Sequence, residues 1–495
     1  MANIFFSMGT TVRFFLFITG IFCVTSSIYA QNRRTNNNNK PPVNQPDTGK
    51  KGSLIIVGAK DTNINHTDQY LTLKQCIDYA LIHQPALNRS LININVTKET
   101  NAVNLAAWLP QVNATGSLVH YLTTSSNGVA VTSSGSTTGT TTTGTTTGSS
   151  TRSSAANSFV PQLAVSQAIF SPSLLYTSRS APLFVKQAQE ITDSTKIFLI
   201  SAISKSFYNV LLNLEQINVL KEDTARLGQN VRDTYHQYIG GIVDETNYEE
   251  ATITLNNSMA QLKQANENVV PQFAILKQLM GFPPEQRFNV SFDTLQMMQG
   301  IHIDTAQQLR YESRIEYQQL NTQKGLQNEL LHFYRSAYLP TVSAFFNYSL
   351  QYQNNNFPNL LSSSYPNSIV GLSFSIPIFT GFARTHSIQR AKLQSQLLNW
   401  DEVELKSQIY TEYSSALASY KGNLYNLQLL EKNVALAKRA YFVINLQYKQ
   451  GIVAYLNVIT AESNLITSEI SYLNALFQVL SSKIDLQKAM GSISY

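Results

Sequence analysis

The sequence predicts an α+β membrane protein in which each chain gives four strands to a trimeric, twelve-stranded β-barrel. A long periplasmic α-helical coiled-coil tunnel is expected to continue that barrel. Three observations predict this fold: an internal duplication, two pairs of strands with period-two alternation, and helical segments far longer than those of ordinary globular domains.

Residues 1–30 have the pattern of a secretory signal peptide. Arg13 is the only charge, an apolar run follows it, and small residues precede Gln31, where the mature chain is expected to begin. Cys23 follows a large aromatic residue, so lipidation is not expected. The mature chain would keep only Cys76, which excludes an intramolecular disulfide and is expected to be a small core residue.

Residues 31–60 are expected to form a flexible basic tether, because prolines and asparagines accompany six basic residues and one acidic residue. The whole chain has a formal net charge of +6. Once the signal and the tether are set aside, residues 61–495 keep 29 of the 36 basic and 29 of the 30 acidic residues. The predicted folded body is therefore neutral, and no nucleic-acid partner is expected.

Two segments of the chain repeat one pattern at an offset of 210 residues. The segment from Gly241 to Gly281 matches the segment from Gly451 to Gly491. We therefore expect two repeats separated by a connector and followed by a short tail. These parts are a first repeat over 61–281, a connector over 282–307, a second repeat over 308–491 and a tail over 492–495.

Each repeat is predicted to hold two strands, and apolar side chains alternate with polar ones along them. The alternation is clearest from Val342 to Tyr352, where Phe345 is the exception. The four strands are expected at about 111–122, 159–170, 341–352 and 369–378.

The loops between the paired strands differ in length. The loop over 123–157 contains a Ser/Thr/Gly tract that cannot bury enough apolar surface to pack, so we interpret it as an expanded loop. The matching loop over 353–367 is short and rich in turn residues.

A long helix is predicted from Pro172 to Ile239, because apolar residues recur there by threes and fours as in a coiled-coil seam. At about 1.5 Å per residue its path is near 100 Å. Four tilted strands can cross a bilayer but cannot close a barrel, and an open edge in lipid leaves backbone groups unpaired. Closure must therefore come from other chains, and a homotrimer in contact with membrane lipid supplies twelve strands.

Several motifs follow one another in a fixed order. They are LTLKQCIDYAL at 71–81, Pro85-Ala86-Leu87, Leu-Pro pairs at 109–110 and 339–340, PIFTGF at 377–382, and turns around Gly241 and Gly451 that lead to Ala251, Ala461 and Leu465. Over 71–491 their order, duplication and spacing resemble the TolC family of outer membrane efflux proteins.

The resemblance implies a passive exit duct of a tripartite efflux or secretion system in the outer membrane of a Gram-negative cell. It also implies two partners, a periplasmic adaptor protein and an inner membrane pump of the RND or ABC type. A mixed equatorial region is implied as well. Here it would comprise residues 53–59 and the connector, with Phe288, Val290 and Phe292 alternating as a short strand.

The resemblance further places an adaptor contact and a closed gate at the tips of the two helical hairpins. The candidate tip residues are Tyr238, Gly241, Asn247, Tyr448, Gly451, Asn457 and Thr460. The two glycines are expected to permit a backbone reversal. A hydrogen bond between Tyr448 and Asn247 is the hypothesis for the gate, and the alternative is that both residues only pack or cap helix ends.

Family members often carry aspartates where this chain has Asn457 and Thr460, so an aspartate constriction is not expected here. Acidic residues beyond the first tip are the candidates to replace it, and their alternative role is to complement a helix N-terminus. They are Asp244, Glu245, Glu249 and Glu250.

The sequence contains no HExxH motif, no P-loop and no Rossmann fingerprint, so neither an enzyme nor a cofactor or metal site is predicted. The main alternative is a periplasmic adaptor or a structural coiled-coil protein, which would also have a signal and long helices. Such a protein would not need two pairs of amphipathic strands. A single-chain porin would need many more strands.

Overall fold

The computed structural model describes residues 70–122, 155–291, 301 and 309–493, which all lie in the compact unit His66–Tyr495. Several predicted features lie outside the described residues. They are the signal peptide, the tether, the piece at 53–59, most of the loop over 123–157, and the connector over 292–300 and 302–308.

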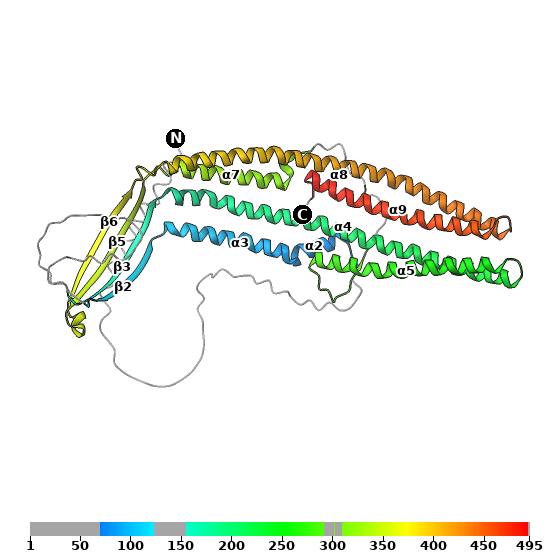
Figure 1. Cartoon of the computed structure of the whole chain (residues 1–495), viewed down its shortest axis with the longest axis horizontal. Coiled ribbons are helices and arrows are strands. Elements are labelled where there is room, and N and C mark those ends of the chain that lie inside the picture. The colour runs from blue at the N-terminus through cyan, green and yellow to red at the C-terminus, as the bar shows by residue number, and fades with distance from the viewer. Residues whose placement is uncertain (1–69, 123–154, 292–300, 302–308, 494–495) are drawn as a thin grey trace, which may run out of the picture. The chain divides into compact units, whose positions relative to one another are not determined.

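The main sheet has four antiparallel strands in the spatial order β2-β3-β5-β6 (Figure 1). Its strands are β2 (Gln111–His120), β3 (Asn157–Phe170), β5 (Thr341–Asn354) and β6 (Ser364–Ser375). A short parallel pair joins β1 (Tyr70–Leu71) to β4 (Asn289–Val290). The short strand expected in the connector is therefore present at Asn289–Val290, whereas Phe288 precedes it and Phe292 lies outside the described residues.

The strand predictions hold for β2, β3 and β5 to within two residues at each end, but the fourth strand was placed wrongly. β6 begins at Ser364 and ends at Ser375, earlier than predicted at both ends. The Ser and Pro residues before Ile369 favoured a turn, yet Pro366 lies on an edge strand opposite Leu350, where a missing N–H is tolerated. The predicted turn contracts to the 3₁₀ helix η4 (Phe357–Ser362).

Two long helices, α4 (Pro172–Ile239) and α8 (Ala383–Lys449), lead away from the sheet (Figure 1). The prediction of a helix over 172–239 is confirmed. Shorter helices lie along them: α2, α3 and α5 beside α4, and α7 and α9 beside α8. Their bounds are α2 (Leu73–His83), α3 (Pro85–Leu105), α5 (Glu245–Met280), α7 (Ile315–Ser336) and α9 (Tyr455–Met490), with 3₁₀ turns η2 (Ala106–Trp108) and η3 (Tyr311–Ser313).

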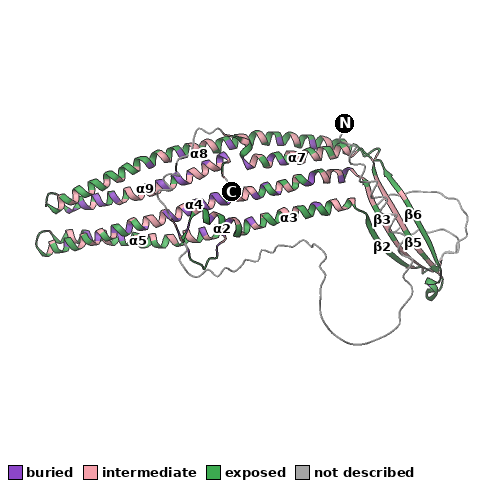
Figure 2. Ribbon diagram, turned by 180° about the vertical axis from the view of Figure 1, so that it is seen from behind, coloured by how far each residue is buried: buried purple, intermediate pink, exposed green. Residues whose placement is uncertain are grey.

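Helix α4 holds the bundle together, because it packs against α3, α5, α7 and α9. Buried residues recur along α4, on the sides that face these helices (Figure 2). They include Ile203, Phe207 and Val210. Within the described residues it is also the one helix long and apolar enough to cross a membrane, and 44% of that apolar window is buried in the structure. The helix is thus partly enclosed by its neighbours.

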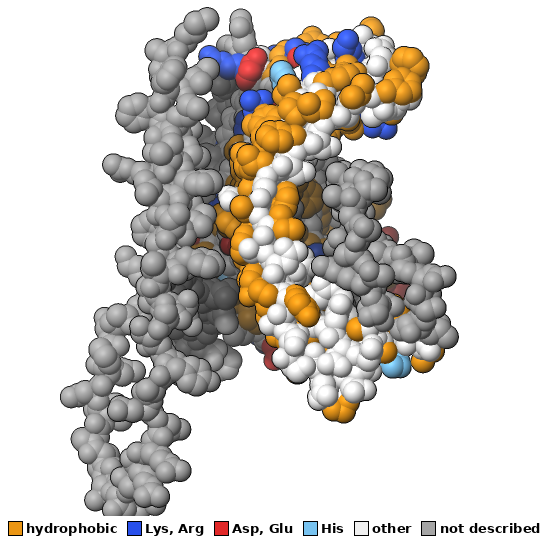
Figure 3. All heavy atoms as spheres, turned by 90° about the vertical axis from the view of Figure 1, so that its left-hand side faces the viewer, with side chains coloured by type: hydrophobic (Ala, Val, Ile, Leu, Met, Phe, Trp, Pro, Cys, Tyr) orange, Lys and Arg blue, Asp and Glu red, His pale blue; other side chains and the backbone are white. Residues whose placement is uncertain are grey.

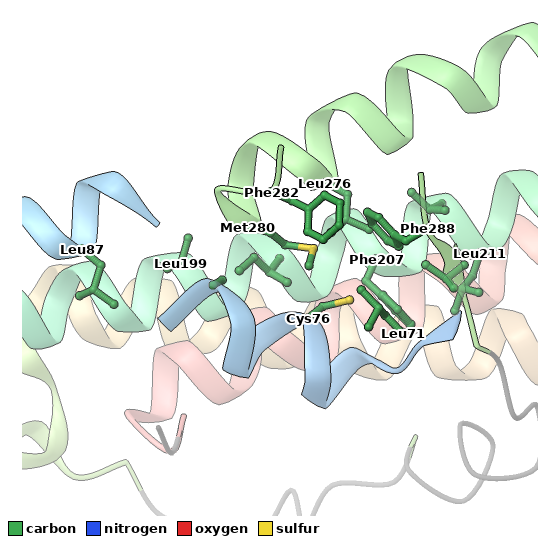
Figure 4. Close-up of a cluster of buried hydrophobic side chains, with 14 residues drawn as sticks. Leu71, Cys76, Leu87, Leu199, Phe207, Leu211, Leu276, Met280, Phe282 and Phe288 are labelled. Carbon is green, nitrogen blue, oxygen red and sulfur yellow. The ribbon is translucent and has the colours of Figure 1, made fainter. Parts of the chain in front are cut away.

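A buried cluster joins α2, α4 and α5 next to the β1–β4 pair (Figure 4). Cys76 is fully buried in it beside apolar side chains such as Met280 and Phe207, and this burial raises the pKa of its thiol to about 12. The prediction of an inert core cysteine is confirmed.

Candidate channel wall and helical tips

The sheet is a wall with two chemically different faces. The register aligns the apolar positions of all four strands, for example Val112 with Val165, Val165 with Phe346, and Phe346 with Val370. Because side chains alternate along a strand, the intervening residues share the other face. Those residues include Asn113, Thr115, Gln162, Asn347, Ser349 and Ser373.

None of the four strands contains Lys, Arg, Asp or Glu. Figure 3 faces the sheet and shows hydrophobic and uncharged polar side chains along it. A charged side chain on a lipid-facing strand position costs about 2–4 kcal/mol at the bilayer midplane. An uncharged wall with one apolar face is thus compatible with lipid on that face and water on the other.

Phe345 is the apolar exception on the polar face of β5, and the structure explains it. It lies directly opposite Gly371, and a Cβ added to that glycine would stand 2.7 Å from the Phe345 ring. The ring therefore covers the space that a side chain at 371 would fill.

Within the described part of the chain, the outer strands β2 and β6 each have one unpaired edge. Most residues of both strands are exposed, including Val112, Val370 and Phe374. An edge that exposes N–H and C=O groups favours pairing with another strand.

At the far ends of the helices, two hairpins have the same turn geometry. Gly241 and Gly451 have φ of +68° and +74°, which is the left-handed region that a Cβ disfavours. Their N–H groups donate to the carbonyl oxygens of Tyr238 at 2.9 Å and Tyr448 at 2.8 Å. The predicted backbone reversal at both glycines is confirmed.

The Tyr448 hydroxyl donates to Oε1 of Gln237 at 2.8 Å and so ties α8 to α4. The predicted partner Asn247 is not the acceptor in this chain, because Gln237 comes within reach one helix turn before the tip. Tyr448 is half-buried, and this burial raises the pKa of its hydroxyl. Tyr238 and Asn247 are half-buried too.

The remaining tip candidates lie on the surface. Asn457 and Thr460 are exposed and line one groove between α8 and α9, together with Ala437, Ala440, Ile444, Val453, Ala461 and Asn464. Asp244 is the N-cap residue of α5, yet its carboxylate makes no capping hydrogen bond. Glu245 stands in the first turn of that helix, and Glu249 and Glu250 are exposed further along it. The structure does not bring these acidic side chains to the Asn457 groove.

Sequence reasoning missed a buried polar cluster behind the tips, which we call the acidic junction. It consists of Asp223, Arg226 and Asn230 on α4, Ser258 on α5, and Glu462 on α9. Arg226 contacts both carboxylates, Asp223 at 3.3 Å and Glu462 at 3.4 Å. Ser258 donates to Asp223 at 2.7 Å, and Asn230 donates to Glu462 at 3.2 Å.

Both carboxylates of the acidic junction are removed from water, with 1% of Asp223 and 2% of Glu462 exposed. Burial, with the nearby Asp223 charge as second cause, raises the pKa of Glu462 to about 7. Burial also raises the pKa of Asp223. One sequence signal existed: Glu462 follows Ala461 in a stretch whose apolar spacing to Leu465 predicts an inward face.

Among the described residues, no group of three or more His, Cys, Asp or Glu side chains is placed to hold a metal ion. The Arg226 guanidinium already occupies the position between the two buried carboxylates. The described geometry thus consists of a sheet with two chemically different faces and two helical hairpins that are connected by the acidic junction.

Comparisons with known proteins agree with this geometry. The family model described as "Outer membrane efflux protein" matches residues 76–282 and 328–492. The outer membrane protein TolC of Vibrio cholerae is 19% identical over 334 residues, which is 66% of this chain and 76% of that protein.

Two solved structures have the same fold. The outer membrane protein VceC of Vibrio cholerae aligns with a TM-score of 0.65 at 15% identity, over 85% of this chain and 96% of VceC. The CmeC outer membrane channel of Campylobacter jejuni aligns with a TM-score of 0.64 at 18% identity, over 91% of this chain and 94% of CmeC. The chain belongs to the outer membrane efflux protein family and is an outer membrane efflux channel of the tripartite type.

Proposed function

We propose that three copies of this chain close a twelve-stranded barrel in the outer membrane and continue it as a helical tunnel into the periplasm. The observation that carries the proposal is the sheet: four uncharged strands with one apolar face and two unpaired edges, β2 and β6. Pairing β6 of one chain with β2 of the next satisfies those edges in lipid.

The trimer would act as a passive exit duct that receives substrates from an inner membrane pump of the RND or ABC type through a periplasmic adaptor. The chain would supply neither energy nor chemistry. The neutral body and the uncharged wall support a conduit that leaves substrate choice to the pump.

The two halves of the chain would form the duct as structural repeats, 61–281 and 308–491, on either side of the connector over 282–307. The matched hairpins support this division. α5 and α9 each have 36 residues, and each ends on a left-handed glycine, Gly281 or Gly491.

The helical tips would bind the adaptor and close the duct at rest. The exposed tip residues Asn457 and Thr460, with Glu249 and Glu250, are the proposed contact and lining positions. The bond from Tyr448 to Gln237 is the proposed restraint on α8, since it ties that helix to α4.

The duct is tested by purifying the mature protein from the outer membrane, measuring its native mass and recording its conductance in planar bilayers. A conducting trimer is expected, and a soluble periplasmic monomer contradicts the proposal.

For the tip, Tyr448→Phe should raise the conductance of the closed channel, because it removes one net hydrogen bond of about 1 kcal/mol per chain. Tyr425→Phe, on the exposed surface of the same helix, is the control. Equal conductance in the two variants would exclude Tyr448 from the gate.

A further inference from the structure

The acidic junction lies where the two helical hairpins meet. Between hairpin α4–α5 and hairpin α8–α9, contact runs mainly through α4 and α9. Glu462 belongs to α9, and its two hydrogen-bond donors, Arg226 and Asn230, both belong to α4. Ser258 of α5 reaches the junction through Asp223. Separating the hairpins therefore exposes this cluster to water.

The charges of the junction do not balance when both acids are ionised. Arg226 is the cation that contacts the two carboxylates, and about a third of its side chain remains exposed while theirs are almost fully buried. Two buried anions that share one cation leave one negative charge without compensation, which is unfavourable away from water. One added proton makes the buried cluster neutral.

Among the residues that the structure describes, no second cation pairs with Glu462. On α8, Tyr441 lies against Arg226, 5.9 Å from the guanidinium carbon to the ring centroid. Lys438 of α8 is paired with Glu469 of α9 at 3.0 Å, and Glu469 adds to the negative field at Asp223. Tyr455 of α9 is buried nearby and its hydroxyl is neutral around pH 7, because burial raises its pKa.

We propose that the acidic junction is a proton-controlled latch, in which Glu462 binds a proton when the hairpins are joined and releases it when they separate. Acid would then hold the two hairpins together, and alkali would loosen them. Its meaning for the conduit rests on the proposed function, because loosened hairpins would open the tips of the tunnel.

The sign follows from the direction of the pKa shift. The pKa of Glu462 is about 7 in the joined hairpins against a model value of 4.5 for an exposed glutamate. The joined state is thus fully favoured below about pH 4.5 and loses that advantage as the pH rises through about 7. Complete exposure on separation would change the ratio of joined to separated hairpins by on the order of a hundredfold across this range.

The latch is tested by measuring the distance between the two tips. Ile242 and Ile452 occupy matching exposed positions just after Gly241 and Gly451, so cysteines introduced there can carry spin labels. Cys76 is fully buried and does not compete for the label. Labelled chains are diluted into unlabelled ones, and distances are measured by pulsed electron resonance on the full mature protein at about pH 5 and about pH 9, on either side of the Glu462 pKa.

The unaltered junction should give a short, narrow distance distribution in acid and a longer, broader one in alkali. Glu462→Gln mimics the protonated form and should stay short and narrow at both values. Asp223→Asn removes the neighbouring negative charge and should shift the midpoint of the change to lower pH. If Glu462→Gln does not fold, that shift still tests the latch.

Glu267→Gln is the matched control, because Glu267 is an exposed carboxylate on α5 that pairs with Lys263, away from the acidic junction. It should behave as the unaltered protein does. A distribution that does not change with pH, in protein whose helix content is unchanged, overturns the latch. The distance measurement does not depend on conductance. A result that overturns the latch therefore leaves the proposed exit duct untouched, and a result that overturns the duct would appear only in the bilayer recordings.

Discussion

Single residues set the geometry at both ends of each hairpin. Gly451 and Gly491 both have positive φ, +74° and +67°, but their surroundings differ. A Cβ at Gly451 would meet nothing within 4 Å, whereas a Cβ at Gly491 would stand 2.7 Å from the carbonyl oxygen of Ser313. One glycine is required by its backbone alone, and the other by its backbone and a close approach of η3.

The two alanine variants should therefore differ in stability. Gly451→Ala should lower the free energy of unfolding by about 1 kcal/mol, the cost of placing a Cβ in a left-handed conformation. Gly491→Ala should cost a further 1–3 kcal/mol or so, because the backbone of Ser313 must move. Thermal unfolding of the two purified variants measures the difference, and equal unfolding midpoints would contradict the close approach.

Phe345 and Gly371 form a second residue-scale pair. Gly371→Val should destabilise the sheet by about 1–3 kcal/mol, because the Phe345 ring occupies the new side chain's space. The double variant Phe345→Ala with Gly371→Val should recover most of that loss. The unfolding temperature of the assembled protein measures both the loss in Gly371→Val and the recovery in the double variant. A double variant no more stable than Gly371→Val alone would show that the ring is not what excludes a side chain there.

At the scale of elements, backbone hydrogen bonds join the described ends of the β2–β3 hairpin. The ladder runs to His120 opposite Asn157, and one more bond joins the Tyr121 N–H to the Ala156 carbonyl at 2.8 Å. The strand ends thus meet where the Ser/Thr/Gly tract departs.

Deleting residues 125–153 should leave assembly intact, since five residues then remain between Tyr121 and Ala156 and loops of that length close hairpins. Loop length changes the closure entropy only slowly, so the change in stability should be under about 2 kcal/mol. Native mass and bilayer conductance of the deletion variant test this. Loss of the assembled form would assign the tract a structural role.

Elements whose sequence carries a sustained period could be predicted, and those fixed by contacts could not. The threes-and-fours spacing placed α4 from Pro172 to Ile239 correctly, because one apolar stripe must face the same neighbours along its whole length. The start of β6 was missed because Pro366 favours a turn locally, while pairing with β5 holds it in a strand.

At the tips, too, local geometry could be predicted from the sequence and long-range contacts could not. The positive φ of Gly241 and Gly451 followed from the repeated turn sequence, but the partner of Tyr448 did not, because Gln237 and Tyr448 are 211 residues apart. The burial of Asp223 and Glu462 likewise depends on how α4 meets α9. Glu462 carries one local signal, its place beside Ala461 in a stretch of inward apolar spacing, and Asp223 carries none.

For the whole molecule, the central claim is that the sheet of one chain is incomplete and is closed by its neighbours. The strands can cross a bilayer and are uncharged, but β2 and β6 leave two rows of backbone groups unpaired. In lipid each unpaired group costs several kcal/mol. Closure between chains therefore determines whether the chain can be a channel at all.

Disulfide scanning across the two sheet edges tests this claim most directly. A cysteine at Thr115 on β2 is combined in turn with cysteines at positions 366–372 on β6, and mature protein from the outer membrane is oxidised. Gln162→Cys with Ser349→Cys, which are paired within the chain, is the control for a link that adds no mass. The account predicts that at least one edge combination yields covalent dimers and trimers on a non-reducing gel. Monomers alone from every edge combination, with the control pair fully oxidised, would contradict it.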